Sequence, residues 1–293
     1  MPKLPSAAAL VALLTISLLA APAPASAATR RAHRPIVIVW LENHTASQIT
    51  KQVAPFLSSL RGTERTFSNY HGVTRPSLPN YLAFASGGTK GKSGTDSIKA
   101  GEIHDRTIWG QLAQAGVSFG IYQESMPKIC YGGSSASAPG PQGGPYVLRH
   151  NPATPFAEVF HSKLCGHVKP LSSMPKRLPK VSFVTPAICN DMHGVGDNSL
   201  GTSCHSGTSA IIRRGDSWMQ RHVRSWRNRG ATVFITFDEG DSNLYAVLIG
   251  RGISHSVISR RVTHYSLLAG LERRFHLPRL GAAGATTPLR LGR

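Results

Sequence analysis

Oxygen-bearing side chains follow two short apolar runs of the sequence. They are Glu42 and Asn43, after residues 35–40, and Asp238 and Glu239, after residues 231–237. Three carboxylates and one amide are hard oxygen ligands, which suit one divalent cation such as Mg²⁺, Ca²⁺ or Mn²⁺. Acidic residues also cap helices that follow strands, and either pair alone would favour that role. Both pairs together, in a chain with only 14 acidic residues, favour a metal site.

Ser77 is the candidate nucleophile. It lies in the segment TRPSLPNY (residues 74–81) and would begin a helix, where free backbone N–H groups favour a phosphoryl oxygen. Serine needs a base or a metal to become a good nucleophile, and the chain has no G-x-S-x-G motif. Coordination of Ser77 to the cation is the remaining means of activation, and Asn80 is placed to donate its amide to the phosphate. The alternative is that Ser77 only caps its helix.

Histidines are the candidates for proton transfer. His193 lies in the segment NDMHG, with Asp191, directly after a predicted strand over residues 180–186. His150 and His264 are the other two candidates. An imidazole near its normal pKa can deliver the proton that a leaving alkoxide needs. A lone histidine more often fills the core or the surface, and that alternative stays open for His150 and His264.

The elements that position these residues follow from the spacing of apolar residues. Short apolar runs alternate with helical patterns, which predicts an α/β fold: a central, mostly parallel sheet flanked by helices. Strands are expected over residues 35–40, 117–122, 180–186, 231–237 and 245–249, and helices over residues 52–60, 77–85, 107–115, 208–228 and 265–275. Ligands of such sheets bind beyond the carboxyl ends of the strands, so both acidic pairs and His193 would share one crevice.

The ends of the chain differ from its middle. Residues 1–27 have the form of a cleaved export signal, with an apolar run over residues 7–20 and the triplet Ala25-Ser26-Ala27. That run is too short for a permanent membrane anchor. We expect a short tail over residues 28–34, a single domain with loop insertions over residues 35–280, and a loose tail over residues 281–293. The protein is therefore expected to be secreted.

Export places the four cysteines in an oxidising compartment, where two disulfides are the default. Of the three possible pairings we favour Cys130 with Cys165 and Cys189 with Cys204, because each would close a local excursion rich in glycine and serine.

The net charge of +19 indicates phosphate-rich partners such as lipid headgroups, nucleic acid or an anionic cell wall. No nucleic-acid motif or aromatic stacking platform accompanies the charge, so no specific nucleic-acid binding is expected. We expect a monomer that contacts anionic membranes peripherally.

Short motifs occur in a fixed order along the chain: VWLEN, RPSLPNYLAFASG, YQESMP, RHNP, VSFVTPAICNDMHG, GDSWM, TFDEGD and THYSLL. Together they resemble the bacterial phosphoesterase family, which includes secreted acid phosphatases and phospholipase-C-type enzymes and belongs to the alkaline phosphatase superfamily. The resemblance covers residues 35–280 and is strongest to secreted acid phosphatases that act on phosphatidylinositol 3-phosphate. It implies an alkaline-phosphatase-like fold for this phosphoesterase domain.

The resemblance also implies a role for each candidate residue. It implies metal ligation by Glu42, Asn43, Asp238 and Glu239, phosphorylation of Ser77, a phosphate surrounded by Asn80, Asp191 and His193, and further site positions at His150 and His264. Two departures affect the surroundings of His193. Gly194 stands where many relatives carry an acidic residue, and the loop that holds Cys204 is longer.

These residues predict two-step phosphoryl transfer by a secreted, metal-dependent acid phosphatase. Ser77 would attack phosphorus, and water would then release phosphate from the phosphoserine. Phosphomonoesters are the expected substrates, with phosphatidylinositol 3-phosphate among the candidates. A phosphodiesterase or phospholipase C is the alternative, because the same metal and serine would serve a pocket that admits a second ester group. A non-catalytic basic protein that binds anionic surfaces is less favoured, since it leaves the acidic pairs without a role.

Overall fold

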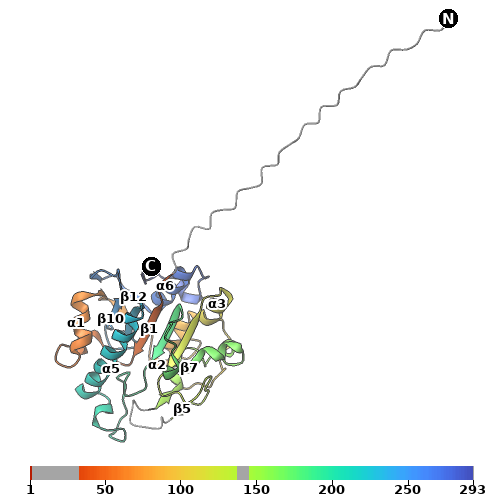
Figure 1. The fold of residues 1–293 in the computed structure, drawn as a ribbon. Helices are drawn as coiled ribbons and strands as arrows, with labels where there is room; N and C mark the ends of the chain where they lie inside the picture. The colour runs from red at the N-terminus through yellow and green to blue at the C-terminus, as the bar shows by residue number, and fades with distance from the viewer. Residues whose placement is uncertain (2–32, 137–144, 293) are drawn as a thin grey trace. The chain divides into compact units, whose positions relative to one another are not determined.

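β1 (Ile36–Leu41), which directly precedes Glu42, lies inside a sheet of eight strands (Figure 1). The computed structural model describes Met1, residues 33–136 and residues 145–292. Within these residues the strand order is β11-β2-β10-β9-β1-β8-β4-β7. The other strands are β2 (Arg65–Phe67), β4 (Phe119–Gln123), β7 (Val168–Pro170), β8 (Val181–Thr185), β9 (Thr232–Phe237), β10 (Ala246–Ile249) and β11 (Ser256–Ile258). Both pairings of β10 are antiparallel and the others are parallel, so β10 alone runs against its neighbours.

Short elements complete the described chain. Two further two-stranded sheets pair β3 (Tyr70–His71) with β12 (Val262–Thr263), and β5 (Ser135–Ala136) with β6 (Tyr146–Val147). Short 3-10 helices cover residues 46–48, 148–150, 163–167, 171–173, 202–204 and 281–285.

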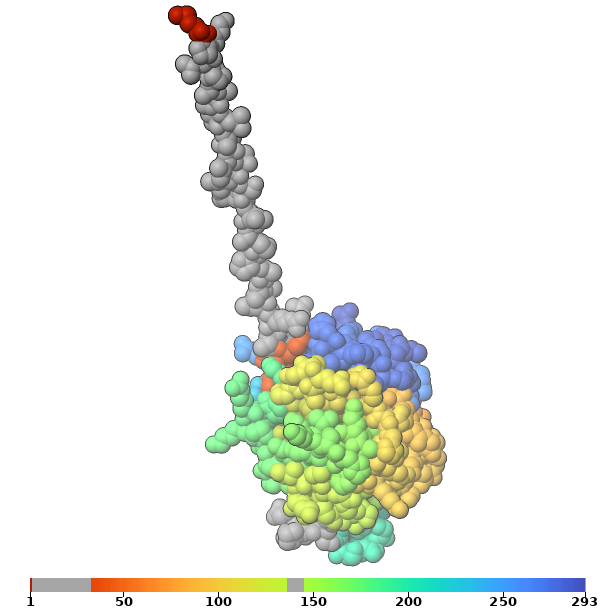
Figure 2. Space-filling model, turned by 90° about the vertical axis from the view of Figure 1, so that its right-hand side faces the viewer, coloured from red at the N-terminus to blue at the C-terminus, as the bar shows by residue number. Residues whose placement is uncertain are grey.

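Helices cover the sheet in two groups. α1 (Pro55–Thr63) packs against α5 (Ser209–Asn228), while α2 (Ser77–Ser86), α3 (Ile108–Gln114) and α6 (His264–Phe275) pack against one another (Figure 1). The short α4 (Ala157–Phe160) lies against α3. Figure 2 shows the face of α3, where the yellow segment that contains it lies beside the blue C-terminal segment. Gln111 Nε2 donates to Pro278 O (3.1 Å) across this junction.

Burial on both faces explains the composition of the central strands. Every residue of β1 is 0% exposed, and the strand alternates isoleucine and valine before Trp40. A parallel strand covered by helices on both faces reads as a continuous apolar run, which is why its position was predictable. The neighbouring β8 and β9 are buried in the same way.

The predicted strands and helices are all present, with ends that differ by a few residues. The predicted fold class, a mostly parallel sheet with flanking helices in a single domain, is confirmed. The helix expected from residue 52 begins at Pro55, because proline fits the first helical turn. The sequence did not predict β2, β7 or β11, which have only three residues each.

The expectation of a loose C-terminal tail is wrong for the described residues. Leu289 and Leu291 are at most 2% exposed. Leu289 N donates to Ser266 O (3.0 Å), and Arg274 Nη1 donates to Leu291 O (2.8 Å). Arg274 Nη2 also donates to Arg34 O (2.8 Å), so this buried arginine fastens both ends of the domain.

The predicted export signal, residues 1–27, and most of the tail over residues 28–34 lie outside the described residues. In the part of the chain that is described, no helix has the length and apolarity needed to cross a bilayer.

α1 depends on a carboxylate from another helix, which gives a test of the fold. Its N-cap residue provides no side-chain hydrogen bond. Instead Asp216 accepts from Phe56 N (3.0 Å) and Leu57 N (2.8 Å). We expect Asp216→Ala to lower the free energy of unfolding by about 2 kcal/mol in chemical denaturation, because two buried donors lose their acceptor. Ser217→Ala, an exposed neighbour, is the control, and equal effects of both changes would contradict this role.

Candidate active site

The parallel register of β1 and β9 brings the two acidic pairs together. Leu41 pairs with Phe237, and Asp238 N donates to Leu41 O (3.0 Å). Glu42 and Asp238 therefore leave the sheet side by side at its carboxyl edge. Asn43 N donates to Asp238 Oδ1 (3.0 Å) and joins the two loops. Asn43 has a φ of 57°, a left-handed conformation that asparagine tolerates better than most residues.

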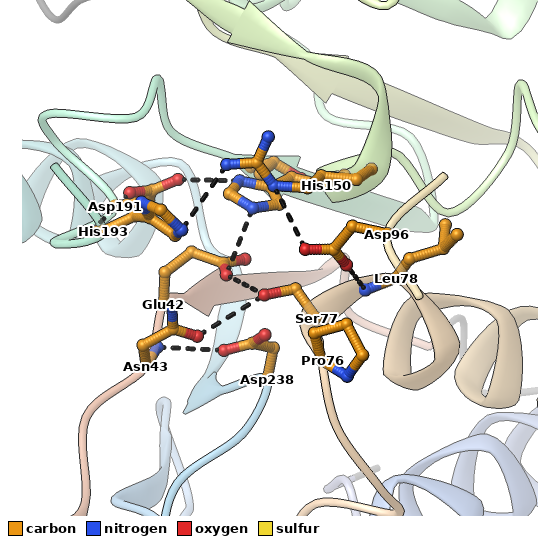
Figure 3. A network of polar contacts seen from close by, with 12 residues as sticks. Glu42, Asn43, Pro76, Ser77, Leu78, Asp96, His150, Asp191, His193 and Asp238 are labelled. Carbon is orange, nitrogen blue, oxygen red and sulfur yellow. Dashed lines mark hydrogen bonds and ion pairs between the residues drawn. The ribbon is translucent and has the colours of Figure 1, made fainter. Parts of the chain in front are cut away.

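Ser77 faces this pair from the first turn of α2. Its Oγ lies 2.9 Å from Glu42 Oε2 and 3.4 Å from Asn43 Oδ1 (Figure 3). The residue is buried, and α2 begins at Ser77 as the sequence predicted. Four side chains from three separate parts of the sequence thus meet. We call Glu42, Asn43, Ser77 and Asp238 the Ser77 cluster.

Buried carboxylates dominate the electrostatics of this cluster. Burial raises the pKa of Glu42 well above its usual value, and the charges of Asp238 and Asp191 raise it further. Burial also raises the pKa of Asp238 and that of Asp191. Asp238 Oδ2 is buried and has no hydrogen-bond partner among the described residues. The donor set therefore fits a divalent cation, which would satisfy the free oxygen and compensate the buried charge.

His150 lies between two of the buried carboxylates. Its Nδ1 is 3.1 Å from Asp191 Oδ2, and its Nε2 is 3.3 Å from Glu42 Oε2. Ligand atoms of these three residues lie within 4.8 Å of one another, so they form a second donor set for a metal ion, which shares Glu42 with the Ser77 cluster. Burial lowers the pKa of His150 well below its usual value, with Arg149 and His193 adding to the effect.

His193 borders the same space. Its backbone N–H donates to Asp191 Oδ1 (2.8 Å), and its Nδ1 lies 2.8 Å from Gly194 O. The other ring nitrogen, Nε2, lies 3.5 Å from Arg149 Nη2. Burial lowers the pKa of His193. The structure thus places His193, His150 and Asp191 together, next to the Ser77 cluster (Figure 3).

Gly194 packs against the loop that holds Cys204. Gly194 has a φ of 72°, and a Cβ at this position would lie 2.5 Å from Cys204 O. Val195 N donates to Cys204 O (2.8 Å), and the Cys189–Cys204 disulfide closes the loop. A side chain has no room at position 194 because the tethered segment packs against it. The other predicted disulfide, Cys130–Cys165, is also present.

His264 lies beneath the site and contacts its backbone. Its Nε2 is 2.5 Å from Asp238 O, and its Nδ1 is 3.0 Å from Tyr70 OH. The ring packs on Trp40 at a centroid distance of 4.2 Å. Burial lowers the pKa of His264 to about 4. A neutral ring with both nitrogens engaged holds the backbone of Asp238 in place.

Asn80 holds the loop that presents Ser77. Its Oδ1 accepts from Val73 N (2.7 Å) and Thr74 N (3.2 Å). Its Nδ2 donates to Thr74 O (2.8 Å) and Pro76 O (3.1 Å). Because these bonds occupy the whole amide, it is not free to donate to a phosphate in this arrangement, which differs from the expectation.

Glu239 lies at the rim of the site. Its Oε2 is 3.5 Å from Arg75 Nε, and Arg75 also pairs with Asp241. Burial raises the pKa of Glu239 to about 7, and the charge of Asp238 contributes. Glu239 is thus paired with Arg75 in this arrangement, and its ligation of a metal stays a prediction.

The sequence did not predict three site residues, namely Tyr81, Arg149 and Asp96. Tyr81 OH donates to Glu42 Oε1. Tyr81 is four residues from Ser77 and therefore lies on the same face of the helix, so the sequence could have predicted it. Arg149 stands inside the motif RHNP, whereas Asp96 lies in a polar loop without any periodic pattern.

The fold is that of the alkaline phosphatase superfamily. A protein of that superfamily from Vibrio parahaemolyticus has a TM-score of 0.58 at 11% sequence identity, and the alignment covers 88% of this chain and 70% of that one. The lipoteichoic acid synthase LtaP from Listeria monocytogenes has a TM-score of 0.54 at 8% identity, with 84% and 72% covered. At such identities the likeness establishes the fold alone.

Sequence comparison identifies the family. The model of the Phosphoesterase family matches residues 36–243. A phosphatidylinositol-3-phosphatase of Mycobacterium tuberculosis is 31% identical over 280 residues, which cover 90% of this chain and 84% of that protein. A phosphate-repressible acid phosphatase of Penicillium chrysogenum is 28% identical over 269 residues, 84% of this chain and 60% of that protein. The chain belongs to the phosphoesterase family, as its motifs predicted, and is a phosphoric ester hydrolase of the acid phosphatase type.

The engaged amide of Asn80 leads to a testable prediction. We expect Asn80→Ala to lower the free energy of unfolding by about 2–3 kcal/mol in chemical denaturation, because the loop before Ser77 loses several hydrogen bonds to a buried amide at once. Asn69→Ala is the control, since Asn69 is only partly buried and its amide contacts Ser259 O (3.1 Å) and His71 Nε2 (2.6 Å). Unchanged stability of Asn80→Ala together with weaker binding of inorganic phosphate would instead indicate that the amide contacts the substrate.

Proposed function

We propose that this phosphoesterase is a secreted, metal-dependent acid phosphatase that hydrolyses phosphomonoesters through a phosphoserine at Ser77. The observation that carries the proposal is the 2.9 Å hydrogen bond from Ser77 Oγ to Glu42 at the start of α2. The Ser77 hydroxyl is buried and directed at a carboxylate. It is well suited to nucleophilic attack once its proton has an acceptor.

Ser77 supplies the nucleophilic oxygen. Its proton passes to Glu42 as Oγ bonds to phosphorus and the bond from phosphorus to the alcohol oxygen breaks. The positive end of the α2 dipole favours the negative phosphoryl oxygens. One divalent cation, Mg²⁺, Ca²⁺ or Mn²⁺, would lower the pKa of the hydroxyl and neutralise charge. Its proposed ligands are Glu42, Asn43, Ser77, Asp238 and Glu239.

His193 donates a proton to the leaving alcohol in this mechanism. Its Nδ1 lies against Gly194 O, so the donated proton comes from Nε2, and the ring acts as the imidazolium. Asp191 contacts both His193 and His150 and fixes their relative positions. Water then attacks the phosphoserine, inorganic phosphate leaves, and the Ser77 hydroxyl is restored.

Phosphomonoesters are the proposed substrate class, with phosphatidylinositol 3-phosphate as a candidate. The bacterial relative named as a phosphatidylinositol-3-phosphatase supports that candidate, and the net charge of +19 would attract an anionic membrane that carries it. Phosphodiesterase or phospholipase C activity is the second candidate. Comparing p-nitrophenyl phosphate, bis(p-nitrophenyl) phosphate and phosphatidylcholine as substrates separates the two, and preference for either diester would contradict the monoesterase.

Secretion is the proposed location. Two disulfides fit an oxidising compartment, and residues 1–27 have the composition of a cleaved signal. Under this proposal the mature chain begins at Ala28.

Replacement of the nucleophile gives the first test. We expect Ser77→Ala to lower kcat on p-nitrophenyl phosphate by at least about 10⁴-fold, because no other oxygen occupies the attacking position. Asp238→Asn should also inactivate the enzyme, since it removes a charged ligand. Ser86→Ala, at the far end of α2, is the matched control and should remain active. Full activity of Ser77→Ala would refute the mechanism.

Removal of the cation gives the second test. Dialysis against a chelator should abolish hydrolysis and lower the Tm, because the carboxylates of the Ser77 cluster then repel one another. Adding back Mg²⁺, Mn²⁺ or Ca²⁺ should restore both, with a stability gain of about 2.7 kcal/mol at a hundredfold excess over Kd. Activity and Tm that are insensitive to both treatments would exclude metal dependence.

A further inference from the structure

We propose that Arg149 binds the phosphoryl group of the substrate and that Asp96 is the positioning residue that holds its guanidinium beside Ser77. The ligand class is a phosphate monoester dianion. This inference deepens the proposed function and rests on Ser77 being the nucleophile.

Asp96 connects Arg149 to the start of α2. Its Oδ1 accepts from Leu78 N (2.9 Å), and its Oδ2 lies 3.6 Å from Arg149 Nε. Leu78 directly follows Ser77, so a single carboxylate relates the guanidinium to the nucleophile. In the view of Figure 3, Ser77 lies between Asp238 on one side and Asp96 on the other. A phosphoryl group at Ser77 would therefore have Asp238 on one side and Asp96, which contacts Arg149, on the other.

The guanidinium of Arg149 has donors available for a ligand. Its Nη2 lies 3.5 Å from His193 Nε2, which is a long contact. Its Nε is buried and makes no hydrogen bond within the described residues, with Asp96 beyond hydrogen-bond distance. Arginine carries five N–H donors in a planar fork, which matches two oxygens of a phosphate. The side chain is 26% exposed, so a substrate can reach it.

Charge favours Arg149 over the other arginine near Ser77. Arg75 is 58% exposed and is already paired with Glu239 and Asp241. Arg149, in contrast, acts on the interior of the site, where its charge lowers the pKa of Asp191 against the larger effect of burial. A dianion that approaches buried carboxylates needs positive charge on more than one side. We infer that the Arg149 guanidinium provides it on the side opposite the metal ion.

The test measures phosphate binding separately from turnover. Inorganic phosphate is titrated calorimetrically into Mg²⁺-loaded Ser77→Ala protein, with and without Arg149→Ala. We expect Arg149→Ala to weaken phosphate binding at least tenfold. In the active enzyme it should lower kcat/KM on p-nitrophenyl phosphate by about 100-fold. The loss on bis(p-nitrophenyl) phosphate should be smaller, because a diester carries one negative charge fewer.

A double-mutant cycle tests the role of Asp96. Asp96→Asn keeps an acceptor for Leu78 N and removes the charge that attracts Arg149. We expect it to lower kcat/KM about tenfold in the wild-type background and to have almost no further effect in Arg149→Ala. Losses that multiply in the double variant would show that Asp96 acts independently of Arg149 and would overturn the positioning role.

Controls keep the outcomes distinct. Arg106→Ala removes the same charge from an exposed site and should leave both assays unchanged. Should Arg149→Ala fail to fold, Arg149→Lys replaces it, with an intermediate loss expected because one ammonium cannot match two oxygens. Wild-type phosphate affinity in a folded Arg149 variant overturns the inference even when Ser77→Ala is inactive. Activity in Ser77→Ala would instead refute the proposed function itself.

Discussion

The pairing of β1 with β9 decides where the proposed active site of this phosphoesterase lies. Leu41 and Phe237 are partners in a parallel ladder, so the residues that follow them emerge together. A shift of one residue would turn every side chain of a strand to the opposite face. Because both faces of β1 are covered by core residues, such a shift is strongly disfavoured. The register of the backbone alone thus brings Glu42 and Asp238 close together, without any contact between side chains of the site.

The stability of the sheet also supports an unfavourable local arrangement. Glu42, Asp191 and Asp238 are fully buried, and burial raises the pKa of each of them. An acidic group of this kind persists only where the surrounding packing holds it in place, and it becomes favourable when a cation is bound. The proximity of these carboxylates is what the proposed phosphoryl transfer needs, because the groups that would compensate charge are then already positioned.

Much of the site consists of residues that position others. Asn80 holds the loop before Ser77, His264 holds the backbone of Asp238, and Asp191 holds two histidines. The Cys189–Cys204 disulfide tethers the loop that follows His193. The geometry of the proposed site therefore depends on hydrogen bonds behind the reactive groups as well as on those groups themselves.

The limits of sequence reasoning follow from what a sequence encodes locally. Continuous apolar runs predicted β1 and β9, and the topological rule for ligand sites then predicted that the acidic pairs after these strands would meet. Ser77 was added to them because a serine needs a base or a metal to become a good nucleophile. The orientation of a side chain is not local information. Asn80 and His264 lie near the Ser77 cluster, but the Asn80 amide and His264 Nε2 are directed to backbone groups. Asp96 reaches α2 from a loop that has no periodicity, and the C-terminal segment is held by Arg274 through contacts distant in sequence.

The position of the cation tests the central claim most directly. Crystals grown with Mn²⁺ locate the ion by its anomalous scattering, and the account predicts a peak within bonding distance of Glu42, Asn43 and Asp238, next to Ser77 Oγ. The peak should disappear in Asp238→Asn. A peak confined to His150 and Asp191, or an enzyme that is fully active with no ion near Ser77, would contradict the account.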